Sequence, residues 1–296
     1  MNVVADALTA VIPAAGLGTR MVPATKEMPK EMLPIPARDD GMFIFKPFIQ
    51  LVFENLYAGG VRTFVFVVGR GKRILQDHFI VDWSFHDLLK AKGKDVEARA
   101  LARFYNMVEN TTIIWVDQPS PKGLGDAVYR GLKAVKTERV VVHLGDVATY
   151  SPWGESVVPA FLRESLSRSE CGNVIHVIEV EDPRNYGVVV PGEEWIETGN
   201  KLLPFMFPVK GVVEKPSTPP SNYAISGLYL FDTSDILGAI EKSMANPSTG
   251  EYELTDAIAL IAREKRLCAG LSRPAIFIDI GRPSKYLEAI ERLAGL

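Results

Sequence analysis

Cysteine and histidine are scarce in this chain of 296 residues, which holds two cysteines and four histidines. Cys171 and Cys268 are too few and too far apart in the sequence for a disulfide framework or a zinc site. The histidines show no metal-ligand spacing such as HxxxH. This cysteine usage predicts a protein of the reducing cytoplasm.

Long hydrophobic runs and an excess of one charge are missing as well. Residues 1–16 lack a basic start, and Asp6 and Pro13 interrupt their apolar stretch, so neither a signal peptide nor a membrane-spanning helix is predicted. The net charge of −3 provides no general electrostatic surface for nucleic acid or an anionic membrane. We therefore expect neither of these partners, and any anion site has to be local.

Short apolar runs rich in β-branched residues recur through the first half of the chain. They are LTAVIP (8–13), TFVFVV (63–68), TIIWV (112–116) and RVVVHL (139–144). Such runs are typical of strands buried on both faces, and segments with helical periodicity lie between them. The alternation predicts an α/β fold: a Rossmann-like mixed, mostly parallel sheet flanked by helices and built by right-handed crossovers.

The pattern changes twice along the chain. Residues 78–110 are of mixed polarity and predict a helical insertion on the surface. After Asp146 several strands follow one another, and helices return only near the end. We expect a single domain over residues 1–296, with the insertion near 78–110 and a second half that begins at about residue 150.

The stretch AAGLGTRMVPATKEMPKEMLP (14–34) combines a glycine turn with three cations, Arg20, Lys26 and Lys30. Glycines at 16 and 18 would let backbone N–H groups approach a phosphate closely. The Walker pattern does not match, and Met21 occupies the third glycine position of GxGxxG. A tight turn with solvated cations would explain each residue alone, but the group in one proline-stiffened loop predicts a polyphosphate site.

The longer stretch VIPAAGLGTRMVPATKEMPKEMLPI resembles the signature of the sugar-1-phosphate nucleotidylyltransferases, and in particular its UTP–glucose-1-phosphate uridylyltransferase branch. Further similar motifs follow in order: QPSPKGLGDAV, LGDV, NYGVV, GVVEKP, SNYAISGLYLF, GEYELTDAI and IDIGRPSKYLEA. The helical insertion also resembles this branch. The resemblance implies transfer of a uridylyl group from UTP to glucose 1-phosphate, which gives UDP-glucose and pyrophosphate. It also implies a homodimer or homotetramer.

For the nucleotide, the resemblance implies a loop that wraps the triphosphate. Its backbone positions are Ala14, Ala15, Gly16 and Gly18. Arg20 and Lys30 would act in catalysis on the triphosphate, and Lys26 is a weaker candidate. Gln118 would read the base, since a side-chain amide can pair with the O4 and N3–H edge of uracil or thymine. Gly123 would bring the backbone close to the base, in a loop where this chain has prolines and the family has Gln-Gly.

For the metal, the resemblance implies that Asp146 and Asp279 hold Mg²⁺, which prefers carboxylate oxygens. Asp146 follows an apolar strand, and ligands of open α/β sheets bind at the carboxyl ends of strands. Either aspartate alone would be explained as a turn or helix-capping residue. The resemblance also implies four residues for the sugar phosphate: Gly187, Glu214, Lys215 and Asn222.

Other functions are compatible with parts of this pattern. Within the class, the donor could be dTTP and the acceptor another hexose 1-phosphate, such as that of galactose or N-acetylglucosamine. A non-catalytic nucleotide-sugar sensor is disfavoured because it would not need the full set of cations and aspartates. A dinucleotide-dependent oxidoreductase is disfavoured by Met21. No nucleophile constellation is needed, because a phosphate ionised at neutral pH can attack directly.

Overall fold

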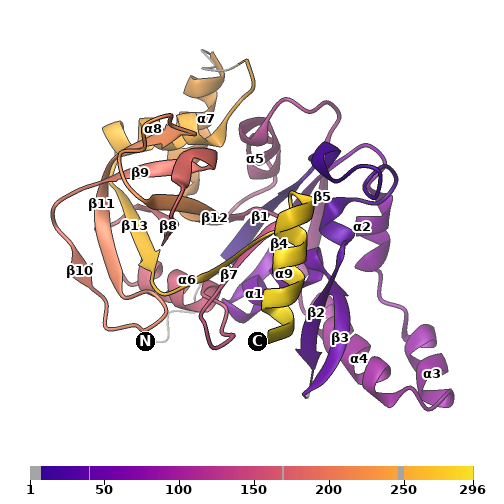
Figure 1. The fold of residues 1–296 in the computed structure, drawn as a ribbon. Helices are drawn as coiled ribbons and strands as arrows, with labels where there is room; N and C mark the ends of the chain where they lie inside the picture. Colours follow the sequence, from indigo (N-terminus) through magenta and orange to yellow (C-terminus); the bar gives the residue numbers. More distant parts are fainter. Residues whose placement is uncertain (1–7, 40, 169, 246–249, 296) are drawn as a thin grey trace, which may run out of the picture.

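The computed structural model describes residues 8–39, 41–168, 170–245 and 250–295. A large mixed sheet runs through the molecule (Figure 1). Its strands are β1 (Leu8–Ala14), β4 (Val61–Gly69), β5 (Thr112–Gln118), β6 (Arg139–His143), β8 (Asn173–Glu179), β9 (Gly187–Pro191), β10 (Ile196–Glu197), β11 (Phe205–Glu214), β12 (Tyr223–Asp232) and β13 (Leu267–Ser272). Over the described residues the strand order is β10-β11-β13-β8-β12-β6-β1-β4-β5, and β9 pairs with β11 and β12.

The four strands predicted in the first half form one continuous parallel ladder of this sheet. β1 lies between β6 and β4, and β5 continues the parallel ladder beyond β4. β12 runs antiparallel to β6 and to β8, so antiparallel pairing dominates in the second half. The predicted α/β fold with a mixed, Rossmann-like sheet is confirmed. The change of pattern after Asp146 marks the place where the pairing changes direction.

Helices cover both faces of the sheet. They are α1 (Phe48–Ala58), α2 (Arg73–His78), α3 (Trp83–Ala91), α4 (Asp95–Glu109), α5 (Leu124–Leu132), α6 (Val158–Leu166), α7 (Thr233–Ala245), α8 (Leu254–Glu264) and α9 (Pro283–Gly295). α1, α4 and α6 pack on one face, and α5, α7 and α8 on the other. Alternate residues of β1 therefore enter two different cores: Ala10 and Ile12 face α1, whereas Val11 faces α5.

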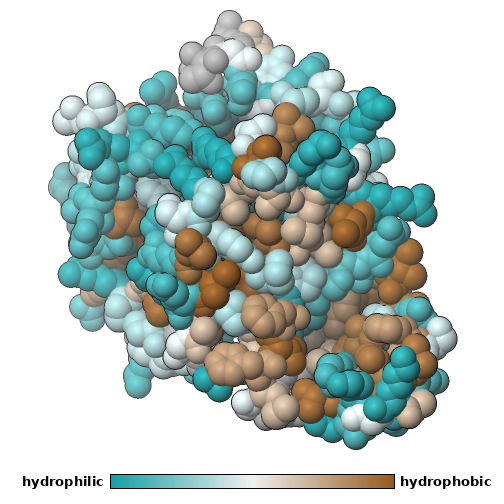
Figure 2. Space-filling model, turned by 45° about the vertical axis from the view of Figure 1, so that its right-hand side comes forward, coloured by the Kyte–Doolittle hydropathy of each residue, from teal (hydrophilic) through white to brown (hydrophobic). Residues whose placement is uncertain are grey.

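Two short antiparallel pairs lie outside the large sheet. β2 (Pro34–Asp39) and β3 (Met42–Pro47) form a hairpin, and β7 (Val147–Tyr150) pairs with β14 (Ile276–Asp279). The hairpin, α3 and α4 project at one end of the molecule (Figure 1). Figure 2 turns this end toward the viewer and shows apolar patches on the surface. Large exposed apolar side chains of this end are Met42, Phe43, Phe45, Ile80, Phe85 and Leu88.

Cys171 and Cys268 form a disulfide, a bond that the prediction of no disulfide framework did not foresee. They are 97 residues apart in the sequence, but their Cα atoms are 5.7 Å apart. Cys268 lies on β13, and Cys171 precedes β8, the parallel neighbour of β13. Pairing between strands distant in sequence brings them together, which spacing alone does not reveal.

Among the described helices, none is long and apolar enough to cross a membrane.

Candidate active site

A two-lobed cleft opens beyond the carboxyl ends of β1 and β6. The large lobe has a volume of about 450 Å³ and extends to residues of β9, β11, β12 and β14. The small lobe, of about 330 Å³, lies between the glycine turn after β1 and the loop that leads into α5. Both lobes are lined by Lys30 and Asp146, so these two residues stand at the junction.

The structure brings most of the predicted site residues to this cleft. The large lobe is lined by Gly16, Gly18, Arg20, Lys30, Asp146, Gly187, Glu214, Lys215 and Asp279. The small lobe adds Ala15, Gln118 and Gly123.

Three residues named from the sequence lie elsewhere. Ala14 is buried beneath the cleft. Asn222 lines a separate depression beside Arg273, so the structure does not bring it to the other predicted sugar-phosphate residues. Lys26 is exposed and pairs with Glu27 in solvent, which agrees with its weaker candidacy.

Gly16 and Gly18 suit their positions in the turn for different structural reasons. Gly18 has φ +65° and ψ 21°, a left-handed conformation that side chains rarely adopt. Its carbonyl accepts a hydrogen bond of 2.7 Å from Thr25 Oγ1, which closes the turn. A Cβ on Gly16 would meet nothing within 4 Å. Gly16 therefore leaves open space between its backbone and the cleft, as a phosphate-binding turn requires.

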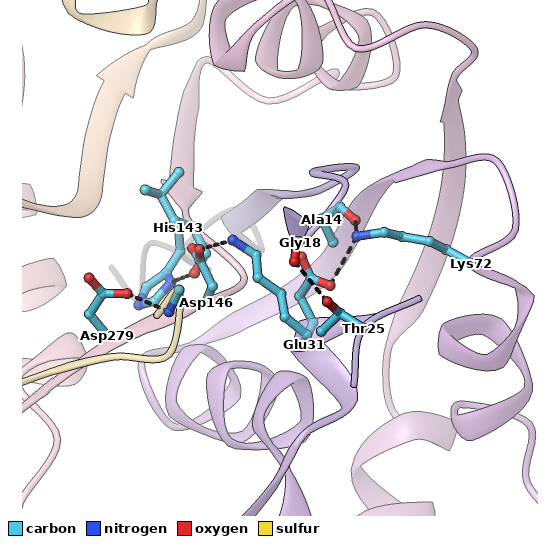
Figure 3. Close-up of polar contacts among 11 residues, drawn as sticks. Ala14, Gly18, Thr25, Glu31, Lys72, His143, Asp146 and Asp279 are labelled. Carbon is cyan, nitrogen blue, oxygen red and sulfur yellow. Dashed lines mark hydrogen bonds and ion pairs between the residues drawn. The ribbon is translucent and has the colours of Figure 1, made fainter. Parts of the chain in front are cut away.

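Lys30 and Asp146 form an ion pair at the lobe junction, in which Lys30 Nζ donates to Asp146 Oδ2. Figure 3 labels Asp146 and, facing it, Asp279. Burial lowers the pKa of Lys30, but the negative charges of Asp146 and Glu31 outweigh it, and the pKa is raised. Burial raises the pKa of Asp146, and the charge and hydrogen bond of Lys30 more than reverse that effect. Both groups are thus held in their charged forms.

A second buried ion pair supports the junction and was not predicted. Lys72 Nζ donates to Glu31 Oε2 at 3.0 Å and to the carbonyl of Ala14 at 2.5 Å (Figure 3). Lys72 and Glu31 are only 8% and 1% exposed, and burial lowers the pKa of the lysine and raises that of the glutamate. Lys72 follows β4 closely, as Asp146 follows β6. The rule about strand ends used for Asp146 would also have found it.

Asp279 faces Asp146 across Gly281. A Cβ on Gly281 would lie 3.0 Å from Asp279 Oδ1 and 3.9 Å from Asp146 Oδ2, so both carboxylates face the same small volume. Burial raises the pKa of Asp279, and the charge of Asp146 adds to the rise. In the described part of the chain no group of three or more His, Cys, Asp or Glu could hold a metal. Two carboxylates are nevertheless the usual protein share of a Mg²⁺ site, which keeps waters and takes substrate phosphate oxygens.

At the far end of the large lobe, Glu214 is held by two neighbours. Lys215 Nζ lies 2.6 Å from Glu214 Oε1, and Thr255 Oγ1 donates to Glu214 Oε2 at 2.6 Å. Lys215 has a φ of +42°. Among the residues that the structure describes, it is the one non-glycine residue with a left-handed backbone conformation. Such conformations concentrate at functional sites because the surrounding structure has to enforce them. Thr255, which lines the lobe, was not predicted and carries no sequence signal of its own.

The small lobe is bordered by Gln118 at the end of β5 and Gly123 before α5. Gln118 Nε2 donates to Asp126 Oδ2 at 2.8 Å and to the carbonyl of Gly123 at 3.2 Å. Gly123 has φ +105°, and a Cβ there would lie 2.6 Å from the carbonyl oxygen of Tyr252. The close backbone approach at Gly123 is therefore to Tyr252, which fixes the loop.

The cleft has the position and chemistry of a phosphoryl-transfer site: a glycine turn, the cations Arg20 and Lys30, and paired carboxylates at the carboxyl ends of strands in an α/β sheet. A family model described as nucleotidyl transferase matches residues 9–295. The chain belongs to this family.

Curated relatives show which members of the family this chain resembles. A UTP–glucose-1-phosphate uridylyltransferase 1 of Streptococcus pyogenes is 35% identical over 272 residues, which cover 88% of this chain and 80% of the relative. A protein of the same name from Staphylococcus saprophyticus is 37% identical over 253 residues, 84% of this chain and 79% of the relative. The resemblance noted in the sequence is confirmed.

Solved structures agree with this result. A UDP-glucose pyrophosphorylase complexed with UDP-glucose has a TM-score of 0.78 and 30% identity, and the match covers 97% of this chain and 98% of that one. A UTP-bound enzyme of the same kind from Acinetobacter baumannii also has a TM-score of 0.78, at 29% identity, with 96% of this chain and 92% of that one covered.

Proposed function

We propose that this protein transfers a uridylyl group from UTP to glucose 1-phosphate, giving UDP-glucose and pyrophosphate. The observation that carries the proposal is the two-lobed cleft whose lobes meet at Lys30 and Asp146. The small lobe offers an amide suited to a base, and the large lobe offers Glu214 and Lys215 for a sugar phosphate. The relatives named for UTP and glucose 1-phosphate support this choice of substrates.

The reaction needs one bond to form and one to break. A phosphate oxygen of the sugar phosphate attacks the α-phosphorus of UTP, and the bond from that phosphorus to the bridging oxygen of the β-phosphate breaks, so pyrophosphate leaves with the electron pair. The protein has to align the two phosphates and stabilise the charge that develops. We assign the triphosphate to the glycine turn, Arg20 and Lys30, and the attacking phosphate to Lys215.

Asp146 and Asp279 would hold Mg²⁺, and the ion would neutralise charge on the triphosphate when bound. Lys30 pairs with Asp146 in the described structure. An entering triphosphate would offer the ammonium of Lys30 a second anionic partner at the junction. Glu31 and Lys72 would hold Lys30 and the glycine turn in position beneath the bound triphosphate.

We also propose that the chain acts as one domain and self-associates as a homodimer or homotetramer, as its resemblance implies. The exposed apolar side chains on the β2–β3 hairpin and on α3 offer surface for such contacts. Light scattering during size-exclusion chromatography would measure the assembly, and a monomer at micromolar concentration would contradict this part of the proposal.

The experiment that tests the function is pyrophosphate release over a grid of substrates. UTP, dTTP, CTP, ATP and GTP are each mixed with glucose, galactose and N-acetylglucosamine 1-phosphates, with and without Mg²⁺. We expect the highest kcat/KM for UTP with glucose 1-phosphate, and no turnover without divalent metal. Preference for dTTP or another hexose would replace the substrate assignment, and absence of release from every pair would leave a binding protein.

A further inference from the structure

The amide of Gln118 is fixed in one orientation by two neighbours. Its Nε2 donates to Asp126 Oδ2 at 2.8 Å and to the carbonyl oxygen of Gly123 at 3.2 Å. A carbonyl and a carboxylate can only accept hydrogen bonds, so the amide nitrogen and not the oxygen has to face them. Both hydrogens of the amide are then used. No hydrogen bond to Gln118 Oε1 occurs within the described residues, which leaves this oxygen as the amide atom available to the small lobe.

Asp126 is placed to enforce this orientation. It lies in the first turn of α5, is only 3% exposed, and its Oδ2 also accepts from Arg130 Nε at 2.8 Å. The guanidinium compensates the charge of the buried carboxylate. If the Gln118 amide turned over, its oxygen would face Asp126 Oδ2, so two hydrogen bonds would be lost and two acceptors would meet.

We propose that Asp126 is a positioning residue that sets base specificity by making Gln118 a pure acceptor. This inference rests on the proposed function, in which Gln118 faces the base of the nucleotide. An acceptor at that point suits uracil, whose N3 carries a hydrogen. Cytosine has an unprotonated N3 that would place a lone pair against Oε1.

The expected selectivity follows from leaving a polar atom unpaired. A site built to hydrogen-bond one group rejects an analogue that lacks the matching hydrogen, because its own buried polar atom then has no partner. The same argument gives no discrimination between uracil and thymine, since both carry N3–H. Asp126 therefore selects the class of pyrimidine, uracil or thymine over cytosine, and leaves the choice between UTP and dTTP to other contacts.

The first test compares kcat/KM for UTP and CTP in the wild type and in Asp126→Asn. An asparagine can donate to Gln118 Oε1, so a turned amide that presents its nitrogen to cytosine no longer meets a carboxylate and is opposed by the carbonyl of Gly123 alone. We expect the UTP:CTP ratio to fall at least tenfold, through both a loss with UTP and a gain with CTP. Asp117→Asn is the matched control, the same exchange at an exposed position of β5, and should keep the ratio unchanged. Equal loss with both nucleotides in Asp126→Asn would show a merely structural role and overturn the proposal.

A second test uses the wild type and does not depend on the folding of a variant. UTP methylated at N3 lacks the hydrogen that Oε1 would accept, whereas UTP methylated at C5 keeps it. We expect a loss of at least tenfold in kcat/KM for the N3-methyl compound relative to the C5-methyl compound. Similar rates for the two would refute the acceptor role of Gln118. If no nucleotide is turned over at all, the proposed function fails instead, so the two failures are distinct.

Discussion

The charged residues of the cleft form a chain of pairs rather than isolated cations. Lys72 holds the carbonyl of Ala14 and the carboxylate of Glu31, and the neighbouring Lys30 holds Asp146. The inner pair is buried, so removing one partner leaves an uncompensated charge. The outer pair faces the lobe junction, where substrate phosphates are proposed to meet.

Lys72→Met should destabilise the fold by about 3 kcal/mol, because Glu31 then remains buried without its partner. The double variant Lys72→Met/Glu31→Gln should recover part of this loss, since neither buried charge remains. Urea unfolding of the two single variants and the double variant measures the coupling between the residues. Purely additive losses would show that the pair does not act as a unit.

Asp146→Asn and Asp279→Asn should each lower kcat more than about a hundredfold, because each removes one of two carboxylates proposed to hold Mg²⁺. Neither should abolish folding. Asp77→Asn on α2 is a matched control, since Asp77 pairs with Arg73 on the surface. Near-normal turnover in either cleft variant, measured by pyrophosphate release, would refute the metal assignment.

Among the secondary-structure elements, the sequence predicted best those strands whose local pattern of apolar residues is distinctive. The apolar runs at β1, β4 and β6 are visible because both faces of these strands are buried. β5 lies at the edge of the sheet and its apolar residues are only partly buried, yet its run of β-branched residues is still visible. The β2–β3 hairpin was not predicted: Pro34 and Pro36 break the usual strand pattern, and among the described strands β2 and β3 pair only with each other. The resemblance and the strand-end rule named most residues of the cleft. Asp126 and Thr255 were missed because their roles depend on partners that only the fold brings close.

His176 on β8 contacts side chains of β12 and β13, and its burial makes the stability of the fold depend on pH. From β8, its Nδ1 lies 2.6 Å from Ser226 Oγ on β12, and its Nε2 lies 2.8 Å from Ser272 Oγ on β13. Burial, with a smaller contribution from His143, lowers its pKa to about 3. An unfolded histidine has a pKa near 6.5, so the unfolded state binds the proton more strongly. The stability that neutral His176 contributes is present above pH 6.5 and is lost as the pH falls toward 3.

Between pH 7 and pH 5 this residue alone should lower the free energy of unfolding by about 2 kcal/mol. His176→Gln keeps a side chain that can hydrogen-bond both serines but cannot take up a proton in this range. Urea unfolding at the two pH values should therefore show a smaller loss in the variant than in the wild type. Equal losses would mean that His176 is not buried in its neutral form.

At the scale of the whole molecule, the Cys171–Cys268 disulfide ties distant parts of the chain together. It closes a loop with a sequence separation of 97 residues, beside the parallel pair β8 and β13. Such a cross-link is unusual for a protein predicted to work in a reducing cytoplasm. Its effect on stability comes chiefly from restricting the unfolded chain, and that effect is larger for longer loops.

Reduction of the disulfide should lower the free energy of unfolding by about 2–5 kcal/mol. Urea unfolding with and without a phosphine reductant measures the difference. The variant Cys171→Ser/Cys268→Ser serves as the control, because reductant should not change its midpoint. An unchanged midpoint for the reduced wild type would contradict the stabilising role, and two titratable thiols in the untreated native protein would contradict the bond itself.

The cleft is proposed to transfer the uridylyl group of UTP, through its α-phosphorus, to the phosphate of a sugar phosphate at the junction of the two lobes. The most direct measurement follows two radioactive labels in the wild-type protein with glucose 1-phosphate and Mg²⁺. Label from [α-³²P]UTP should appear in UDP-glucose, and label from [γ-³²P]UTP should appear in pyrophosphate. Label from the γ-position found in inorganic phosphate or in the sugar phosphate would instead show hydrolysis or kinase chemistry and contradict the account.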